Sequence, residues 1–185
     1  MLRASKTVGI GPFAAVAGSI SQVAAEAGAR AGATNILVDN GGDISIIGAR
    51  DFRVRIYAGE SPISGKFALS VKGKDLPIGI CTSSGSVGHS ISFGNADAVT
   101  IVADEASIAD AAATAVANEV NEKDIELSIK KGLDKADDIP EIKGCLIVRG
   151  EHIGIVGKLP KILTLQDKTE FSSTELSAPS ALFVE

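Results

Sequence analysis

The chain has 185 residues, of which 45% are hydrophobic and 22% charged, and its formal net charge is −5. A chain of this length buries about 70% of the surface that it would expose when unfolded, so we expect one well-packed domain. The acidic balance and the dispersed Lys and Arg residues argue against general nucleic-acid binding, which needs a concentrated basic surface.

The two cysteines, Cys81 and Cys145, are too few for a disulfide framework or a cysteine-based zinc site. We expect both to be buried and reduced. The first residues lack the apolar core of a signal peptide, and no apolar run reaches the roughly 20 residues that cross a bilayer. These features predict a cytoplasmic protein with no membrane partner and no nucleic-acid partner.

The first predicted helix covers residues 12–30, with Pro12 in its first turn and Gly32 after its end. Its larger apolar residues recur at three- and four-residue spacing, namely Phe13, Val16, Ile20, Val23 and Ala27. The opposite face carries small residues such as Ala17 and Gly18, which permit close packing.

Short apolar runs separated by Gly-containing turns predict strands at residues 35–39, 44–47, 52–57, 67–71, 78–82, 90–93 and 98–103. Helices are expected at 105–120 and 124–135, then a hairpin at 145–148 and 153–156 and a last strand at 162–165. Many adjacent strands with few helices between them predict an α+β fold, a mostly antiparallel curved sheet with helices packed on one face. We expect a single domain over residues 1–166 and an irregular tail over 167–185, which is rich in Ser, Thr and acidic residues.

The helix at 105–120 carries a polar stripe, because residues three and four apart share one helix face. Ser107, Asp110, Thr114 and Asn118 lie on this stripe among Ala, Ile and Val. A carboxylate and a hydroxyl are costly to bury unless something binds them, and Mg²⁺ suits both oxygens. The alternative is structural: Asp110 caps a loop and Thr114 bonds to a carbonyl of its own helix.

Two Gly-containing loops are candidates for phosphate binding. In the first, Gly41 and Gly42 precede Asp43 and allow a close approach of backbone to ligand. The second loop offers hydroxyl and backbone N–H groups from Thr82, Ser83, Ser84 and Gly85. Ordinary hairpin turns explain both sequences equally well.

His89 follows the second loop and is a candidate proton carrier or ligand-orienting residue. A hydrogen-bonded structural histidine is the alternative. We read His152, in the hairpin turn, as a surface residue.

Four motifs in this order resemble the ApbE superfamily, which includes Mg²⁺-dependent enzymes that move FMN from FAD onto a protein threonine. They are Gly9–Phe13 opening a helix, Val38–Ile44 with the paired glycines, Cys81–Gly85 with His89, and Ile108–Thr114. The closer similarity is to a short prokaryotic branch of unknown function.

The resemblance implies an ApbE-type fold, related to the T-fold, with a flavin-nucleotide cleft between the two Gly-containing loops and the Ala-rich helix. It implies FAD as cofactor, held by Gly41, Gly42, Asp43, Thr82, Ser83, Ser84, Gly85 and His89. It also implies Mg²⁺ held by Asp110, Thr114 and the backbone carbonyl near Ala14.

The sequence departs from the transferases in three places. Ala15 and Val16 stand where the transferases have a Lys-Gly pair, and only Ser86–Gly88 remains of a longer insertion. We expect no counterpart of the strand and helix that relatives carry upstream of Gly9.

Three functions follow from these observations. The first is a protein that binds a flavin or another nucleotide phosphate with Mg²⁺, with FMN transfer or hydrolysis as its activity. The second is a non-catalytic scaffold or interaction protein of the same fold, in which Asp110 is bonded to protein groups. The third is another metal-assisted reaction with His89 as proton carrier, which requires His89 and Asp110 to line one pocket. We expect a homodimer, because exposed sheet edges are usually paired or covered.

Overall fold

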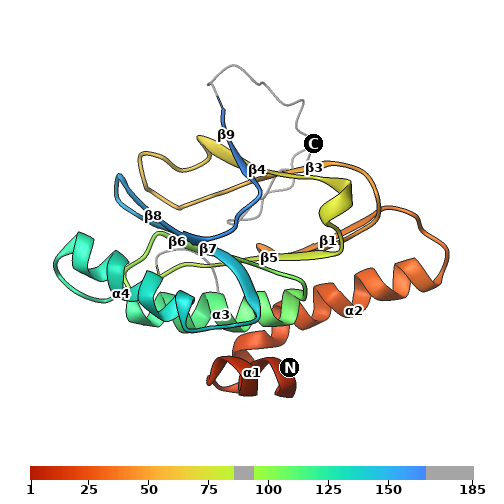
Figure 1. Cartoon of the computed structure of the whole chain (residues 1–185), viewed down its shortest axis with the longest axis horizontal. Coiled ribbons are helices and arrows are strands. Elements are labelled where there is room, and N and C mark those ends of the chain that lie inside the picture. The colour runs from red at the N-terminus through yellow and green to blue at the C-terminus, as the bar shows by residue number, and fades with distance from the viewer. Residues whose placement is uncertain (86–93, 166–185) are drawn as a thin grey trace.

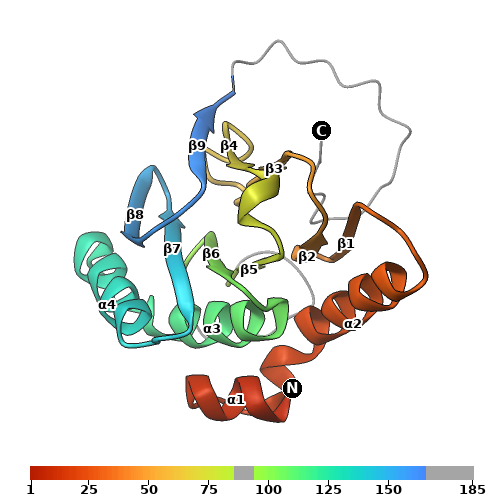
Figure 2. The ribbon, with the colours of Figure 1, turned by 45° about the vertical axis from the view of Figure 1, so that its right-hand side comes forward.

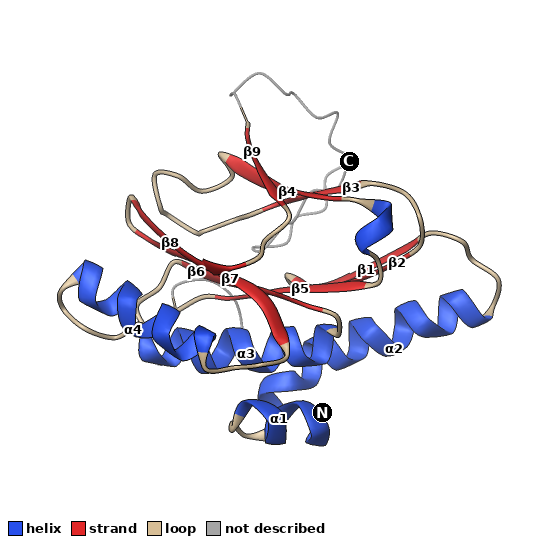
Figure 3. Cartoon of the chain, viewed as in Figure 1, coloured by secondary structure: helices blue, strands red, loops and turns tan. Residues whose placement is uncertain are grey.

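The computed structural model describes residues 1–85 and 94–165. In this part of the chain, three layers lie one above the other: a layer of helices, a six-stranded antiparallel sheet, and a three-stranded antiparallel sheet (Figure 1). All the α-helices lie on one side of the larger sheet (Figure 3). The predicted α+β class is therefore confirmed, with the difference that the strands form two sheets instead of one.

The larger sheet has the strand order β1-β2-β5-β6-β7-β8, and every neighbouring pair is antiparallel. Its strands are β1 (Ile36–Asn40), β2 (Asp43–Ile47), β5 (Ile78–Ser83), β6 (Ala98–Ala103), β7 (Ile142–Arg149) and β8 (His152–Gly157). The smaller sheet has the order β3-β4-β9, formed by Phe52–Arg55, Phe67–Val71 and Lys161–Thr164. The larger sheet is open, with β1 and β8 at its edges.

The helix layer contains α1 (Leu2–Val8), α2 (Val16–Arg30), α3 (Ala106–Glu119) and α4 (Ile125–Asp137). A short 3-10 turn, η1 (Pro12–Ala15), leads into α2, and a second, η2 (Gly73–Asp75), lies between β4 and β5. Figure 2 shows α3 beneath the middle of the sheet, with α2 and α4 on either side of it. The sequence indicated α2, α3 and α4 but neither η2 nor α1, whose seven residues are too few for a periodic pattern. The expectation that no helix precedes Gly9 is therefore wrong.

Two hydrophobic clusters hold the layers together, one on each face of the larger sheet. The first packs α1, α3 and α4 against the sheet and is rich in alanine. The second lies between the two sheets and includes Ile44, Ile46, Leu69, Ile80 and Leu146. The alternation of side chains along each central strand supplies both clusters, because successive residues point to opposite faces.

The orientation of α2 differs from what the size of its apolar residues suggests. The helix turns its small residues Gly18, Ser21 and Ala25 inward, whereas Ile20 and Val23 are 55% and 59% exposed. Small side chains let α2 approach α3 closely, and this contact outweighs the burial of the larger ones.

Both cysteines are free and buried, as expected. Within residues 1–85 and 94–165, no single helix is long and apolar enough to cross a membrane. In this part of the chain, only α1 and residues 12–30 taken together reach that length and apolar character, and the two helices are bent by 110° at the break between them. The expected strand at 90–93 and the expected tail at 167–185 lie outside the described residues.

Candidate functional site

The centre of the candidate site is the contact between the first turn of α2 and the N-terminal half of α3. Gly18 lies so close to α3 that an added Cβ would come within 2.6 Å of the Asp110 Cβ and closer still to the Ala106 carbonyl oxygen. Only glycine fits this position without a shift of one helix. The close packing therefore explains why glycine occupies position 18 despite its unfavourable helix propensity.

Asp110 uses this close approach to cap α2. Its Oδ2 accepts a 2.7 Å hydrogen bond from the N–H of Gly18, and the N–H of Ala17 also donates to the carboxylate. The residue before α2, Ala15, provides no side-chain cap, so a carboxylate from another helix satisfies N–H groups of the first turn. Burial raises the pKa of Asp110 to about 6, although the two N–H donors act to lower it.

The turn between β1 and β2 lies beside the same helix. The side-chain amide of Asn40 donates to the Ala17 carbonyl, and the Asp39 carboxylate accepts from the N–H of Gly42. Gly42 in turn accepts a 3.1 Å hydrogen bond from the N–H of Thr82 at the end of β5. Gly41 and Gly42 have φ angles of 70° and 100°, which explains why glycine occupies both positions.

Asp43, at the start of β2, is paired with Cys81 of β5 and faces the helix layer. Burial is the largest cause that raises the pKa of Asp43 to about 8; the charges of Asp110 and Asp39 contribute to this rise, and a hydrogen bond with Cys81 opposes it. Burial also raises the pKa of the Cys81 thiol well above its usual value, and that thiol donates to the Ala106 carbonyl. The two carboxyl groups of Asp43 and Asp110 therefore lie within electrostatic range of each other beside a neutral thiol.

The predicted residues of the second loop divide between the two faces of β5. The Thr82 hydroxyl bonds to the Thr100 hydroxyl at 2.9 Å, whereas Ser83 lies on the same side of the strand as Cys81, toward the helices. The Ser83 hydroxyl is buried without a hydrogen-bond partner. Ser84 is also buried, Gly85 is exposed, and His89 lies outside the described residues.

Comparisons with known proteins identify the family of the chain. The family model described as "AbpE bacteria" matches residues 1–144. The chain belongs to this family. The match confirms the resemblance that the four ordered motifs indicated.

Curated relatives of this family member are archaeal proteins named "UPF0280 protein". The one from Methanosarcina acetivorans is 47% identical over 173 residues, which are 92% of this chain and 66% of the relative. The one from Methanococcus vannielii is 41% identical over 175 residues, which are 94% of this chain and 70% of the relative. The chain thus spans about two thirds of the length of these relatives.

The fold is similar to that of a solved flavinyl transferase, ApbE from Pseudomonas stutzeri, in its apo form. The TM-score is 0.52 at 18% sequence identity, and the match covers 80% of this chain and 47% of the transferase. The similarity confirms an ApbE-type fold for this family member.

The predicted metal ligands lie on neighbouring elements. The segment η1, which contains Ala14, packs against α3, which carries Asp110 and Thr114. Every residue of α3 from Ala106 to Ala117 is buried except Thr114, which is half-buried. Access to the middle of α3 is therefore by way of the Thr114 side of the helix, one turn from Asp110.

The donor set at this place suits Mg²⁺ better than a transition metal. Residues 1–85 and 94–165 contain no group of three His, Cys, Asp or Glu side chains that could hold a metal ion. Mg²⁺ does not require one, because it is usually bound by one or two carboxylates together with substrate phosphates and water. Asp43, Asp110 and the hydroxyls of Thr114 and the unpartnered Ser83 fit that description.

Two further residues organise the site. The sequence indicated close packing at Gly18, because a glycine inside a helix permits a close approach. No sequence signal marked Gln22, because its role depends on Ser107 of α3, 85 residues further along the chain.

Proposed function

We propose that this domain binds a phosphate-bearing nucleotide, with flavin nucleotides as the first candidates, together with Mg²⁺. The observation that supports the proposal best is the proximity of the Asp43 and Asp110 carboxyl groups where the Gly41–Gly42 turn, the end of β5 and helix α3 come together. A half-buried and a buried carboxyl group within electrostatic range of each other repel when both are ionised, and a divalent cation removes that repulsion.

Each predicted residue has a role in this proposal. Asp110 and Thr114 hold the cation, with the carbonyl near Ala14 as a third oxygen and Asp43 as a second carboxylate. The Gly41–Gly42 turn and residues Ser83 to Gly85 bind the phosphate groups in this proposal. Asp110 acts in this proposal as a cation ligand and not as a base.

Transfer of FMN from FAD to an acceptor hydroxyl is the activity that the resemblance to the flavin transferases suggests. In that reaction the hydroxyl oxygen forms a bond to the FMN phosphorus, the bond between the two phosphates breaks, and AMP leaves with the bridging oxygen. Mg²⁺ would neutralise the diphosphate and stabilise the leaving phosphate. Hydrolysis is the same reaction with water as the acceptor.

Calorimetric titration with FAD and Mg²⁺ tests the binding proposal. The unaltered protein should bind FAD only when Mg²⁺ is present, and Asp110→Asn should weaken this binding while it keeps an oxygen that accepts from Gly18. The matched control is Asp75→Asn, which removes an exposed carboxylate on η2, away from the site. No binding of FAD, FMN or ADP by the unaltered protein with Mg²⁺ contradicts the proposal.

A non-catalytic scaffold is the second candidate, and one observation favours it. Asp110 is hydrogen-bonded to protein N–H groups, which is the arrangement expected of a purely structural carboxylate. Under this function, Asp110→Asn changes neither cation binding nor nucleotide binding. The expected homodimer remains a proposal, which the mass of the protein in solution tests.

A further inference from the structure

We infer that Gln22 is a positioning residue for the proposed cation site, acting through α3 on Asp110. The inference rests on the proposed function. Gln22 itself is no ligand in this proposal: it lies on α2, one helical turn after Gly18, and faces the start of α3.

The first step is the bond that Gln22 makes to α3. Its Oε1 accepts a 3.2 Å hydrogen bond from the backbone N–H of Ser107, in the first turn of α3. The residue before α3, Glu105, provides no side-chain cap. Gln22 of α2 therefore caps α3, while Asp110 of α3 caps α2, and the two helices cap each other.

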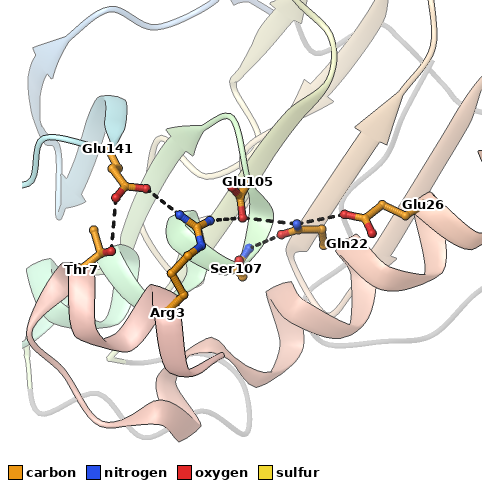
Figure 4. A network of polar contacts seen from close by, with 7 residues as sticks. All are labelled: Arg3, Thr7, Gln22, Glu26, Glu105, Ser107 and Glu141. Carbon is orange, nitrogen blue, oxygen red and sulfur yellow. Dashed lines mark hydrogen bonds and ion pairs between the residues drawn. The ribbon is translucent and has the colours of Figure 1, made fainter.

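The second step is the orientation of the Gln22 amide, which its neighbours determine. The Nε2 group donates to Glu26 Oε1 at 3.1 Å and to Glu105 Oε2 at 3.4 Å (Figure 4). Ionised carboxylates only accept hydrogen bonds, so the amide nitrogen faces them and the amide oxygen faces Ser107. Arg3 of α1 holds Glu105 in place through an ion pair and also pairs with Glu141.

The third step is the geometry of the two reciprocal caps. Gly18 and Gln22 are four residues apart on α2, and Ser107 and Asp110 are three apart on α3, so each pair lies on one helix face. The two hydrogen bonds are thus separated by about one turn along both helices. Two such points, together with the close contact of Gly18 with Ala106 and Asp110, fix both the rotation and the axial position of α3 relative to α2.

The consequence concerns the ligands of the proposed site. Asp110 and Thr114 belong to α3, whereas Ala14 belongs to the turn that leads into α2. The relative position of these oxygens therefore depends on how the two helices are held together. Loss of the Gln22 cap lets α3 rotate or slide, and the ligand oxygens no longer converge.

The test uses the full chain and Mn²⁺ as a probe for the Mg²⁺ site, with free Mn²⁺ measured by electron paramagnetic resonance. Gln22→Met keeps the size of the side chain but removes its hydrogen bonds, and should bind Mn²⁺ about ten-fold more weakly, as is typical when a residue that orients metal ligands is lost. The double variant Q22E/E26Q restores an acceptor for Ser107 and a hydrogen bond between positions 22 and 26, but it replaces the bond to Glu105 with a contact between two carboxylates, so it should recover only part of the affinity. Glu26→Gln alone is the matched control, because it leaves the bond from Gln22 to Ser107 in place.

A second measurement does not depend on a cation. Amide hydrogen exchange at Gly18 reports the bond to Asp110, and Gln22→Met should accelerate it while Glu26→Gln should not. A Gln22→Met variant that binds Mn²⁺ as the unaltered protein does, with unchanged exchange at Gly18, overturns the positioning role alone. Failure of the unaltered protein to bind Mn²⁺ overturns the proposed cation site, and this inference with it.

Discussion

Asp110 and Gly18, 92 residues apart in the chain, are joined by a 2.7 Å hydrogen bond from the Gly18 N–H to the Asp110 carboxylate. This contact places the acidic residue of α3 at the N-terminus of α2, where the helix dipole favours a negative charge. It also brings the polar stripe of α3 to the turn that carries Asp43. The contact depends on the absence of a side chain at position 18.

Gly18→Ala should destabilise the protein by about 1–3 kcal/mol, the usual cost of overpacking a tight contact. Gly28→Ala is the matched control in the same helix, because its Cβ would meet only the flexible Ile36 side chain at 3.4 Å. Gly28→Ala should be neutral or stabilising by up to about 1 kcal/mol. Urea unfolding of both variants checks the pair, and equal effects would contradict the close contact.

Asp110→Ala and Asp110→Asn should separate the capping role from the proposed cation role. Alanine leaves the buried N–H of Gly18 without its acceptor, which costs about 1–3 kcal/mol. Asparagine keeps an acceptor oxygen and should retain most of the stability, while it weakens Mn²⁺ binding. Thermal unfolding and Mn²⁺ titration measure the two roles, and equal stability of both variants would argue against the cap.

Asp43 should make the protein less stable as the pH rises in the absence of divalent cations. Its pKa in the folded state is raised to about 8, so the folded protein holds a proton that the unfolded chain has released above about pH 4. The stabilisation from this proton is complete below about pH 4 and is lost as the pH rises to about 8. Each unit by which folding raises the pKa corresponds to about 1.4 kcal/mol of this stabilisation. Asp43→Asn should remove this dependence.

Urea unfolding of both proteins near pH 5 and near pH 8, with a chelator present, provides the measurement. The advantage of Asp43→Asn over the unaltered protein should grow with pH. A constant difference between the two would show that Asp43 ionises in the folded state as an exposed carboxylate does.

An isoleucine of α2 tests the orientation of that helix, with a buried isoleucine of β2 as the reference. Ile20 is 55% exposed, so Ile20→Ala should change the free energy of unfolding by no more than about 0.5 kcal/mol. Ile46 is fully buried between the sheets, and Ile46→Ala should cost about 2–5 kcal/mol. A large loss from Ile20→Ala would mean that its side chain is covered in solution.

The sequence by itself determined the elements and their class. Short apolar runs with Gly-containing turns indicated most of the strands, and spacing indicated α2, α3 and α4, because these signals are local. The order of four motifs also identified the family, since a series of short motifs in a fixed order is far more specific than any one of them.

Only the tertiary structure decided which faces meet. The larger apolar residues of α2 suggested one buried face, but close packing at Gly18 selected the other. The division of strands into two sheets, the reciprocal caps of Gln22 and Asp110, and the proximity of Asp43 to Asp110 all join residues far apart in the chain. Periodicity cannot predict such contacts, because they depend on how closely two backbones approach, and that distance is set by the whole packed core.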